Sequence, residues 1–423
     1  MYIHVVNRGD TLWQIANYYH TDINEIISVN GLQNQNQLLV GQSLVIPTEE
    51  ILYTVKTGDS LWKIADKFGV SIQDLLWTNR ILTPNIIYPG IVLRIPRKSR
   101  PSIEVNGFNY WLGERAVPIV DEVGDYLTYL SPFTYLIKED GTLQTIDDTA
   151  SIRAASMDNI IPVMVITNFT NNSRGENLAH VVLNSPNIIE NLLSSIINIM
   201  RQRGYKGLNI DFENVLPEDK SAYNNFLQKA VERLHREGFF VSTSLAPKVS
   251  KDQKGVFYEA HDYEAHGKLA DFVVLMTYEW GYRFGSPQAI SPLNEIKRVL
   301  NYAITAIPKE KILMGFQIYA RDWIIPHIEG QEAETMSVQD AIARAYKYGS
   351  VIRYDSVTES PFFHYTDEKG RAHEVWFEDA RSAQAKFNTV KDYGLRGISY
   401  WALGYPFPQN WALLEDNFNI VKR

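Results

Sequence analysis

The chain has 423 residues, enough for about three domains or one large one at roughly 150 residues each. Hydrophobic residues make up 45% and charged residues 21%, which excludes a disordered or fibrous chain. The net charge of −8 argues against a partner of nucleic acid or anionic lipid. There is no cysteine, so disulfides and thiolate chemistry are excluded.

Membrane insertion and secretion are not expected either. No apolar run approaches the roughly 20 residues of a membrane-spanning helix. Residues 1–8 have no basic segment followed by an apolar one, so we expect no signal peptide.

The first hundred residues contain an internal repeat. The run Gly9–Trp13 (Gly-Asp-Thr-Leu-Trp) recurs without gaps as Gly58–Trp62 (Gly-Asp-Ser-Leu-Trp), and both copies end in Ile-Pro. Each copy begins with a short strand-like run, followed by a polar turn that caps a helix. A second apolar-periodic stretch and a closing strand follow. The pattern predicts two small units of the order strand, helix, helix, strand.

These two units, residues 1–48 and 51–97, closely resemble LysM domains. The resemblance implies binding of peptidoglycan or another N-acetylglucosamine-containing glycan in a shallow groove. It makes the turn residues the candidate glycan contacts, which are Gly9, Asp10, Thr11, Gly58, Asp59 and Ser60. The large apolar residues of the motif are expected in the core: Leu12, Trp13, Leu61 and Trp62.

A short basic linker, Arg97–Ser102, precedes a segment that alternates apolar runs with amphipathic stretches. Eight runs read as strands separated mostly by helices, which predicts the α/β class and a (β/α)8 TIM barrel over residues 102–423. The expected strands are Ile103–Phe108, Tyr126–Leu130, Ile160–Ile166, Gly207–Phe212, Phe240–Leu245, Phe272–Met276, Ile312–Gln317 and Gly397–Trp401. Residues 323–377 are too long for one connection, so we predict an inserted α+β lobe there.

The fourth predicted strand carries unusual polar residues. Asn209, Asp211 and Glu213 share one face by period-2 alternation, while apolar residues occupy the other face. Polar side chains inside a barrel are costly unless they function or are paired. Two neighbouring carboxylates would also push their pKa values apart, as an acid beside a stabilising carboxylate requires. A structural ion cluster remains the alternative.

The run Gly207–Glu213 resembles the Asp-Gly-x-Asp-x-Asp-x-Glu signature of glycoside hydrolase family 18. Met276–Glu279 resembles that family's Met-x-Tyr-Asp motif, and Ser399–Trp401 resembles its last strand, which ends in a Trp. The resemblance implies that Glu213 is the general acid and Asp211 orients the substrate's acetamido group. It also implies that Tyr278 hydrogen-bonds that group.

In this family the acetamido oxygen of the substrate is the nucleophile. Further sugar contacts are expected at the strand ends, namely Asn209, Glu279, Gln317, Tyr319 and Trp401. Three positions depart from the family pattern. Lys206 and Asn209 replace the first two Asp residues, and Glu279 replaces the Asp of the Tyr motif. The amide of Asn209 can still donate to Asp211, but it cannot accept a proton during the reaction.

Other candidates have weaker support. His261 and His266 are five residues apart, the wrong spacing for one helical face, so we interpret them as part of a surface helix. Asn168–Thr170 matches a glycosylation acceptor, to which we assign no role. No nucleotide-binding motif occurs. We expect no cofactor and no metal site.

The LysM repeats and the family 18 barrel together resemble spore cortex-lytic enzymes of Bacillus-type bacteria. This resemblance implies an N-acetylglucosaminidase that cuts cortex peptidoglycan or its fragments during germination. We expect a monomer, made in the mother cell and deposited around the spore. The alternatives are a non-catalytic glycan-binding coat protein, disfavoured by Glu213, and a chitinase acting on external chitin.

Overall fold

The structure, a computed structural model, describes residues 1–33, 38–48, 51–68, 70–81, 87–96, 100–169 and 176–422. Residues 97–99 of the predicted linker therefore lie outside the described residues. The chain divides into two units, one of residues 1–101 with 408–419, the other of residues 102–407 with the last few residues from 420. None of the described helices is long and apolar enough to cross a bilayer.

Both repeats form the predicted strand–helix–helix–strand unit, in which the two strands pair antiparallel. The elements of the first copy are β1 (Tyr2–Val5), α1 (Leu12–Tyr19), α2 (Ile23–Asn30) and β2 (Ser43–Ile46). Those of the second are β3 (Ile51–Thr54), α3 (Leu61–Phe68), α4 (Ile72–Asn79) and β4 (Val92–Ile95).

The motif tryptophans are exposed, so the prediction that they belong to the core is wrong. Trp13 is 67% exposed and Trp62 is 62% exposed. In α1 and α3 the buried positions include the first, fourth and fifth residues, which share one helical face. The second position, which the tryptophan occupies, points away from that face. Leu12 and Leu61 take the first position and are buried as predicted.

A helix from near the C-terminus, α14 (Pro408–Asn417), belongs to the same unit as the repeats and packs on α2 and β2. Every residue of β2 is buried, whereas alternate residues of the equivalent strand β4 are exposed. The first repeat is thus covered on both faces of its closing strand. The sequence alone had placed this helix in the predicted barrel segment, residues 102–423.

The second unit is built on a closed barrel of eight parallel strands. In order around the barrel they are β5 (Ser102–Asn109), β6 (Tyr129–Pro132), β9 (Ile161–Thr167), β10 (Gly207–Asp211), β11 (Phe240–Leu245), β12 (Phe272–Leu275), β13 (Ile312–Gln317) and β19 (Gly397–Trp401). Pairing of β19 with β5 closes the ring. The (β/α)8 prediction is confirmed.

All eight predicted strands exist, with one notable shift. The second was predicted to begin at Tyr126, but Gly124–Tyr126 form a short 3-10 helix and the strand begins at Tyr129. The helices around the barrel are α5 (Val117–Val123), α6 (Thr149–Met157), α7 (Glu176–Leu183), α8 (Pro186–Arg203), α9 (Lys220–Arg236), α10 (Tyr263–Leu269), α11 (Leu293–Ala306) and α13 (Ala380–Tyr393). The apolar faces of α8 and α9 pack with buried residues of β9, β10 and β11 in one hydrophobic core.

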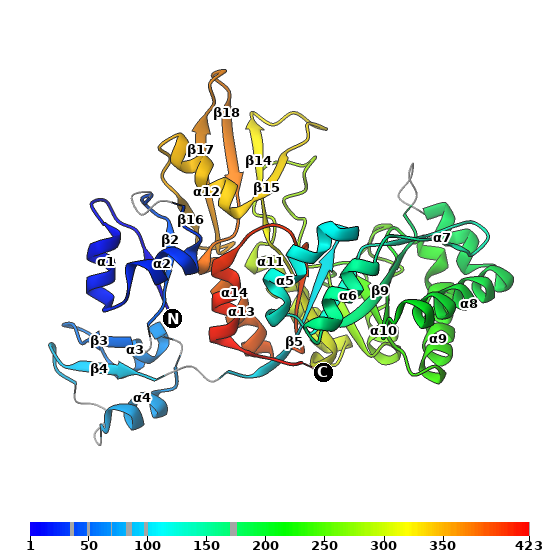
Figure 1. The fold of residues 1–423 in the computed structure, drawn as a ribbon, viewed down its shortest axis with the longest axis horizontal. Helices are drawn as coiled ribbons and strands as arrows, with labels where there is room; N and C mark the ends of the chain where they lie inside the picture. Colours follow the sequence, from blue (N-terminus) through cyan, green and yellow to red (C-terminus); the bar gives the residue numbers. More distant parts are fainter. Residues whose placement is uncertain are drawn as a thin grey trace. The chain divides into compact units, whose positions relative to one another are not determined.

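The part of the chain that connects β13 to β19 forms a separate sheet, the inserted lobe, which is drawn in yellow to orange in Figure 1. It comprises β14 (Tyr319–Ile325), β15 (Glu334–Ser337), β16 (Arg353–Asp355), β17 (Ser360–Thr366) and β18 (Ala372–Trp376), with helix α12 (Val338–Lys347). Its first strand starts at Tyr319, directly after β13 and before the boundary expected at residue 323.

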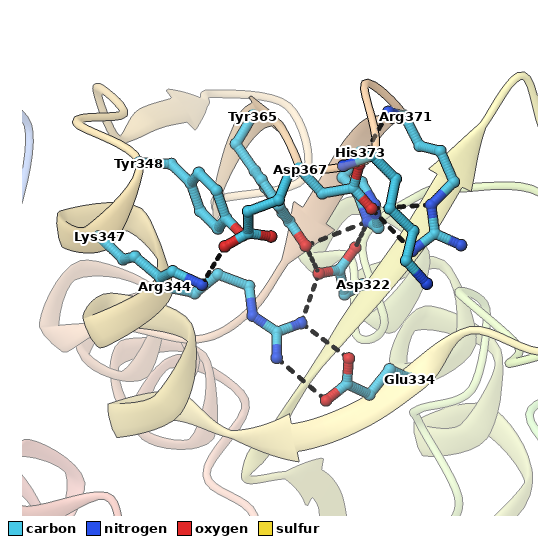
Figure 2. A network of polar contacts seen from close by, with 11 residues as sticks. Asp322, Glu334, Arg344, Lys347, Tyr348, Tyr365, Asp367, Arg371 and His373 are labelled. Atoms are coloured by element: carbon cyan, nitrogen blue, oxygen red, sulfur yellow. Dashed lines mark hydrogen bonds and ion pairs between the residues drawn. The ribbon is translucent and has the colours of Figure 1, made fainter.

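A buried carboxylate ties the lobe together. Figure 2 shows Asp322 of β14 accepting hydrogen bonds from Arg344 of α12 and Tyr365 of β17, both at 2.6 Å. A ring nitrogen of His373, on β18, lies 2.7 Å from the other oxygen of Asp322. Because Asp322 is 4% exposed, these partners compensate its desolvation. Through Asp322 the lobe's strand β14 is thus linked to α12, β17 and β18.

Candidate active site

A cavity of about 860 Å³ opens at the C-terminal ends of the barrel strands, where TIM-barrel active sites lie. Asp211 and Glu213 line it from the end of β10, and Tyr278 from the end of β12. Trp401 lines it from β19, and the inserted lobe contributes Tyr319. The structure thus brings together the three predicted catalytic residues, Asp211, Glu213 and Tyr278, with two predicted sugar contacts, Trp401 and Tyr319.

The alternating residues of β10 have different environments. Asp211 is 5% exposed, whereas Glu213 is partly exposed in the cavity. Asn209 lies deeper in the barrel and is not among the residues lining the cavity. Its amide donates to Ser242 and its carbonyl accepts from Ser244, both at 3.0 Å. In the structure Asn209 is therefore bonded to two serines of β11, where its amide could instead have donated to Asp211.

Burial dominates the electrostatics of Asp211. Desolvation raises the pKa of this carboxyl to about 7, and a hydrogen bond with Ser244 opposes the shift. Its Oδ1 atom is buried and has no hydrogen-bond partner among the described residues. A buried carboxyl with a free oxygen beside a cavity can accept from a bound substrate. Its raised pKa is of the kind found at functional sites.

Tyr278 and Trp401 form an aromatic wall of the cavity. Their ring planes are tilted by only 12°, with centroids 6.4 Å apart. Phe133 and Phe108, which also line the cavity, meet the Trp401 ring edge-on and restrict its orientation. Burial, with the nearby carboxylates Asp211 and Glu213, raises the pKa of Tyr278 well above its usual value. The phenol therefore stays protonated and can donate a hydrogen bond.

Glu279 is engaged by two residues of β14. Arg321 forms a bidentate ion pair with it, at 2.7 and 2.9 Å, and the hydroxyl of Tyr319 also donates to it. Arg321 is 4% exposed and lines the cavity. Arg321 was not identified from the sequence, because the sequence does not show that β14 lies beside the residues that follow β12.

Gln317, a predicted sugar contact, does not line the cavity. Its side chain is fully buried and donates to Glu378, which is paired with Lys386 of α13 at 2.8 Å. Although Gln317 ends strand β13, the polar network behind the barrel takes up its amide. This residue is therefore not positioned to touch a sugar in the cavity.

The candidate glycan-binding residues of the repeats form two matching turns: Gly9, Asp10 and Thr11, and Gly58, Asp59 and Ser60. The glycines have φ of 94° and 88°, a region that favours glycine. Each aspartate accepts from the backbone N–H three residues earlier, at 2.7 Å. Each hydroxyl accepts from the N–H three residues later, at 3.2 Å, and so caps the following helix. Turn and cap geometry thus accounts for these residue types.

The interpretation of His261 and His266 as part of a surface helix is wrong. Both side chains are fully buried, because the segment carrying them packs behind β10 and β11. Burial lowers the pKa of His261 to about 4 and that of His266 to about 3. Asn168, to which no role was assigned, is also buried and contacts the backbone of Glu213.

Among the residues that the structure describes, no three His, Asp or Glu side chains gather as a potential metal site. A closed parallel barrel with a carboxylate pair and an aromatic wall at its C-terminal end defines the glycosidase class of TIM barrels. The chain matches the description "Glycosyl hydrolases family 18" over residues 123–405 and "LysM domain" over residues 4–47 and 53–96. It belongs to glycosyl hydrolase family 18 and is a glycosidase with two LysM domains. The family 18 domain and the LysM domains both imply binding of N-acetylglucosamine-containing glycans.

Several relatives match this chain over nearly their whole length. The "Cortical fragment-lytic enzyme" of Bacillus subtilis (strain 168) is 49% identical, covering 100% of this chain and 99% of the relative. The crystal structure of the spore cortex-lytic enzyme SleL of Bacillus megaterium QM B1551 has a TM-score of 0.89 and 41% identity. It covers 100% of this chain and 99% of that one. The SleL structure of Bacillus cereus has a TM-score of 0.91 and 41% identity, over 100% and 98% of the two chains.

Proposed function

We propose that this protein hydrolyses spore cortex peptidoglycan, or fragments of it, during germination, acting as an N-acetylglucosaminidase. The observation that carries the proposal is the shared cavity of Asp211, Glu213, Tyr278 and Trp401 at the C-terminal end of a family 18 barrel. The names of full-length relatives, cortical fragment-lytic and spore cortex-lytic enzymes, support the substrate class.

Glu213 is the general acid of the proposed reaction. Its carboxyl donates a proton to the glycosidic oxygen while the bond between that oxygen and the anomeric carbon breaks. The partly exposed position of Glu213, against the burial of Asp211, gives the former access to the leaving group. In the second half of the reaction, Glu213 accepts the proton of the attacking water.

The nucleophile is the carbonyl oxygen of the substrate's own acetamido group, which forms a bond to the anomeric carbon from the opposite face. Asp211 accepts from the acetamido N–H and stabilises the positive charge that develops on the cyclic intermediate. The Tyr278 hydroxyl, kept protonated, donates to the acetamido oxygen. Water then opens the ring, so that the product regains the β configuration.

Trp401 supports the sugar that carries this acetamido group by stacking against its apolar face. Glu279, fixed by Arg321 and Tyr319, presents its carboxylate on the lobe side of the cavity, where it can accept from sugar hydroxyls. The shorter Asp of the family at this position would not extend as far. We infer that this change adapts the site to its glycan.

The LysM repeats hold the enzyme on its insoluble substrate and raise the effective concentration of glycan at the barrel. Synthesis in the mother cell and deposition in the coat or cortex region of the spore fit this role. A monomer suffices for catalysis, since every proposed catalytic group comes from one chain.

The product's anomeric configuration tests the proposed reaction. Cortex fragments and chitin oligosaccharides are incubated separately with the enzyme, and products are identified by mass spectrometry and by proton NMR of fresh samples. We expect cleavage of the cortex fragments and an initial β anomer. An initial α anomer would exclude attack by the acetamido group, and a clear preference for chitin oligosaccharides would make the enzyme a chitinase.

A further inference from the structure

The peptide bond between Phe212 and Glu213 is held at both of its polar ends by buried side chains. His261 Nε2 lies 3.0 Å from the Phe212 carbonyl oxygen. The Glu213 N–H of the same peptide donates to Asn168 Oδ1 over 2.9 Å. Asn168 Nδ2 also donates to the Glu213 carbonyl oxygen at 2.7 Å. Three hydrogen bonds from two side chains thus orient the backbone that carries the Glu213 carboxyl.

The surroundings of His261 fix which ring nitrogen carries the proton. The backbone N–H of Ala246 donates to Nδ1 over 2.8 Å, so that nitrogen is an acceptor. The neutral ring therefore carries its proton on Nε2 and donates it to Phe212. Lys248, itself buried, donates to the His261 carbonyl oxygen at 3.1 Å and holds the histidine backbone.

These contacts begin where the strand pairing of β10 ends. The register with β9 runs to the pair Asp211 and Thr167, and the register with β11 runs to the pair Ile210 and Thr243. The residue after Glu213, Asn214, has a left-handed φ of 52°. The chain thus turns away just beyond Glu213. At Glu213, side-chain hydrogen bonds therefore hold the backbone in place of strand pairing.

We propose that Asn168 and His261 are positioning residues, which direct the Glu213 carboxyl into the cavity by fixing the Phe212–Glu213 peptide. Neither side chain lines the cavity, so both act through the backbone and not on the substrate. The inference rests on the proposed role of Glu213 as the general acid. A displacement of about 1 Å from productive geometry can cost roughly 100-fold in rate.

The test measures kcat and KM on soluble cortex fragments for full-length variants whose folding is checked by thermal melting. Asn168→Ala removes both bonds to Glu213. His261→Asn can keep an acceptor for Ala246 but loses the donor to Phe212, whereas His261→Gln can place an amide N–H at the Nε2 position. Two buried residues that do not contact this peptide serve as matched controls, through His266→Asn and Asn106→Ala.

We expect Asn168→Ala and His261→Asn to lower kcat by about 10- to 100-fold, with KM changed less than about threefold. His261→Gln should recover most of kcat, and the controls should lower the melting temperature without lowering kcat. Equal losses of kcat in His261→Asn and His266→Asn, or in His261→Asn and His261→Gln, would overturn the proposal, because they indicate a structural role.

Glu213→Gln in the same assay separates the two hypotheses. Wild-type turnover by Glu213→Gln would refute the general-acid assignment. An inactive Glu213→Gln, together with wild-type kcat in Asn168→Ala, would refute only the positioning role. If His261→Asn does not fold, the comparison of Asn168→Ala with Asn106→Ala decides the question.

Discussion

Gln409 and Asn30 are joined by a buried hydrogen bond although 379 positions separate them in the chain. Gln409 Nε2, on α14, donates to Asn30 Oδ1 at 2.7 Å and also lies 2.9 Å from the Ser43 carbonyl oxygen. Asn30 is 1% exposed, whereas its counterpart in the second repeat, Asn79, is only half-buried. Two repeats of like sequence therefore have unlike surroundings, because only the first is covered by α14.

Gln409→Ala should destabilise the first repeat without affecting the second. The substitution removes a buried donor from Asn30 and Ser43, a loss of about 1–2 kcal/mol. Hydrogen exchange followed by mass spectrometry should find faster exchange in β2 and unchanged exchange in β4, which is the internal control. Gln73→Ala, an exposed change on α4, should alter neither strand. Unchanged protection of β2 in Gln409→Ala would show that the contact contributes nothing to stability.

Glu213→Gln should abolish most turnover while leaving the fold and glycan binding intact. A positioned general acid contributes roughly 10²–10⁴-fold to the rate, and the amide has nearly the same volume as the acid. Rates on cortex fragments, with binding measured by calorimetry, would check this. Glu218→Gln, an exposed change five residues further on, is the control and should turn over normally. Turnover by Glu213→Gln within tenfold of wild type would mean that another group donates the proton.

The barrel could be predicted from the sequence because its strands are short apolar runs with helical stretches between most of them. In a parallel barrel such runs are buried on both faces, and β9 and β10 are almost wholly buried. Tyr126 was misassigned, because local propensity does not reveal where a 3-10 turn gives way to a strand. The union of α14 with the first repeat depends on tertiary contacts that no local pattern encodes.

The candidate site could be predicted only where a residue's position along its own strand determines its place. Asp211 and Glu213 follow from alternation at a strand end. Gln317 has the same kind of position, yet the buried pair of Glu378 and Lys386 captures its amide. His261 supports Glu213 from a segment 48 residues downstream, so only the folded chain reveals it.

The exposed tryptophans beside the glycan-binding turns should contribute to anchoring. Trp13 and Trp62 each follow the capping residue of their turn by two positions and expose a flat apolar ring. Replacing both by Ala should weaken retention on insoluble peptidoglycan by roughly tenfold, equivalent to about 1.4 kcal/mol, with turnover of soluble fragments unchanged. Point substitutions suit this test better than deletion of residues 1–96, which would also uncover α14.

Tyr18→Ala is the matched control for the tryptophan variants. This tyrosine is 75% exposed and lies on α1, in the turn furthest from the glycan-binding residues. Sedimentation with insoluble peptidoglycan should retain Tyr18→Ala as well as wild type. Equal retention of the double tryptophan variant would remove these rings from the anchoring surface.

Asp211 should make the protein less stable as the pH rises from about 4 to about 7. Burial raises its pKa to about 7, whereas an unfolded chain releases this proton near pH 3.9. Between these values the folded protein holds a proton that the unfolded chain has lost, so stability falls with rising pH and is level above about pH 7. Asp211→Asn cannot ionise and should escape this loss. Its free energy of unfolding, relative to wild type, should improve by up to about 4 kcal/mol across that interval.

Calorimetric melting of Asp211→Asn and wild type at several pH values would check this, with the exposed Asp121→Asn as control. A difference between Asp211→Asn and wild type that does not change with pH would mean that Asp211 is ionised throughout, and so stabilised by partners rather than strained by burial.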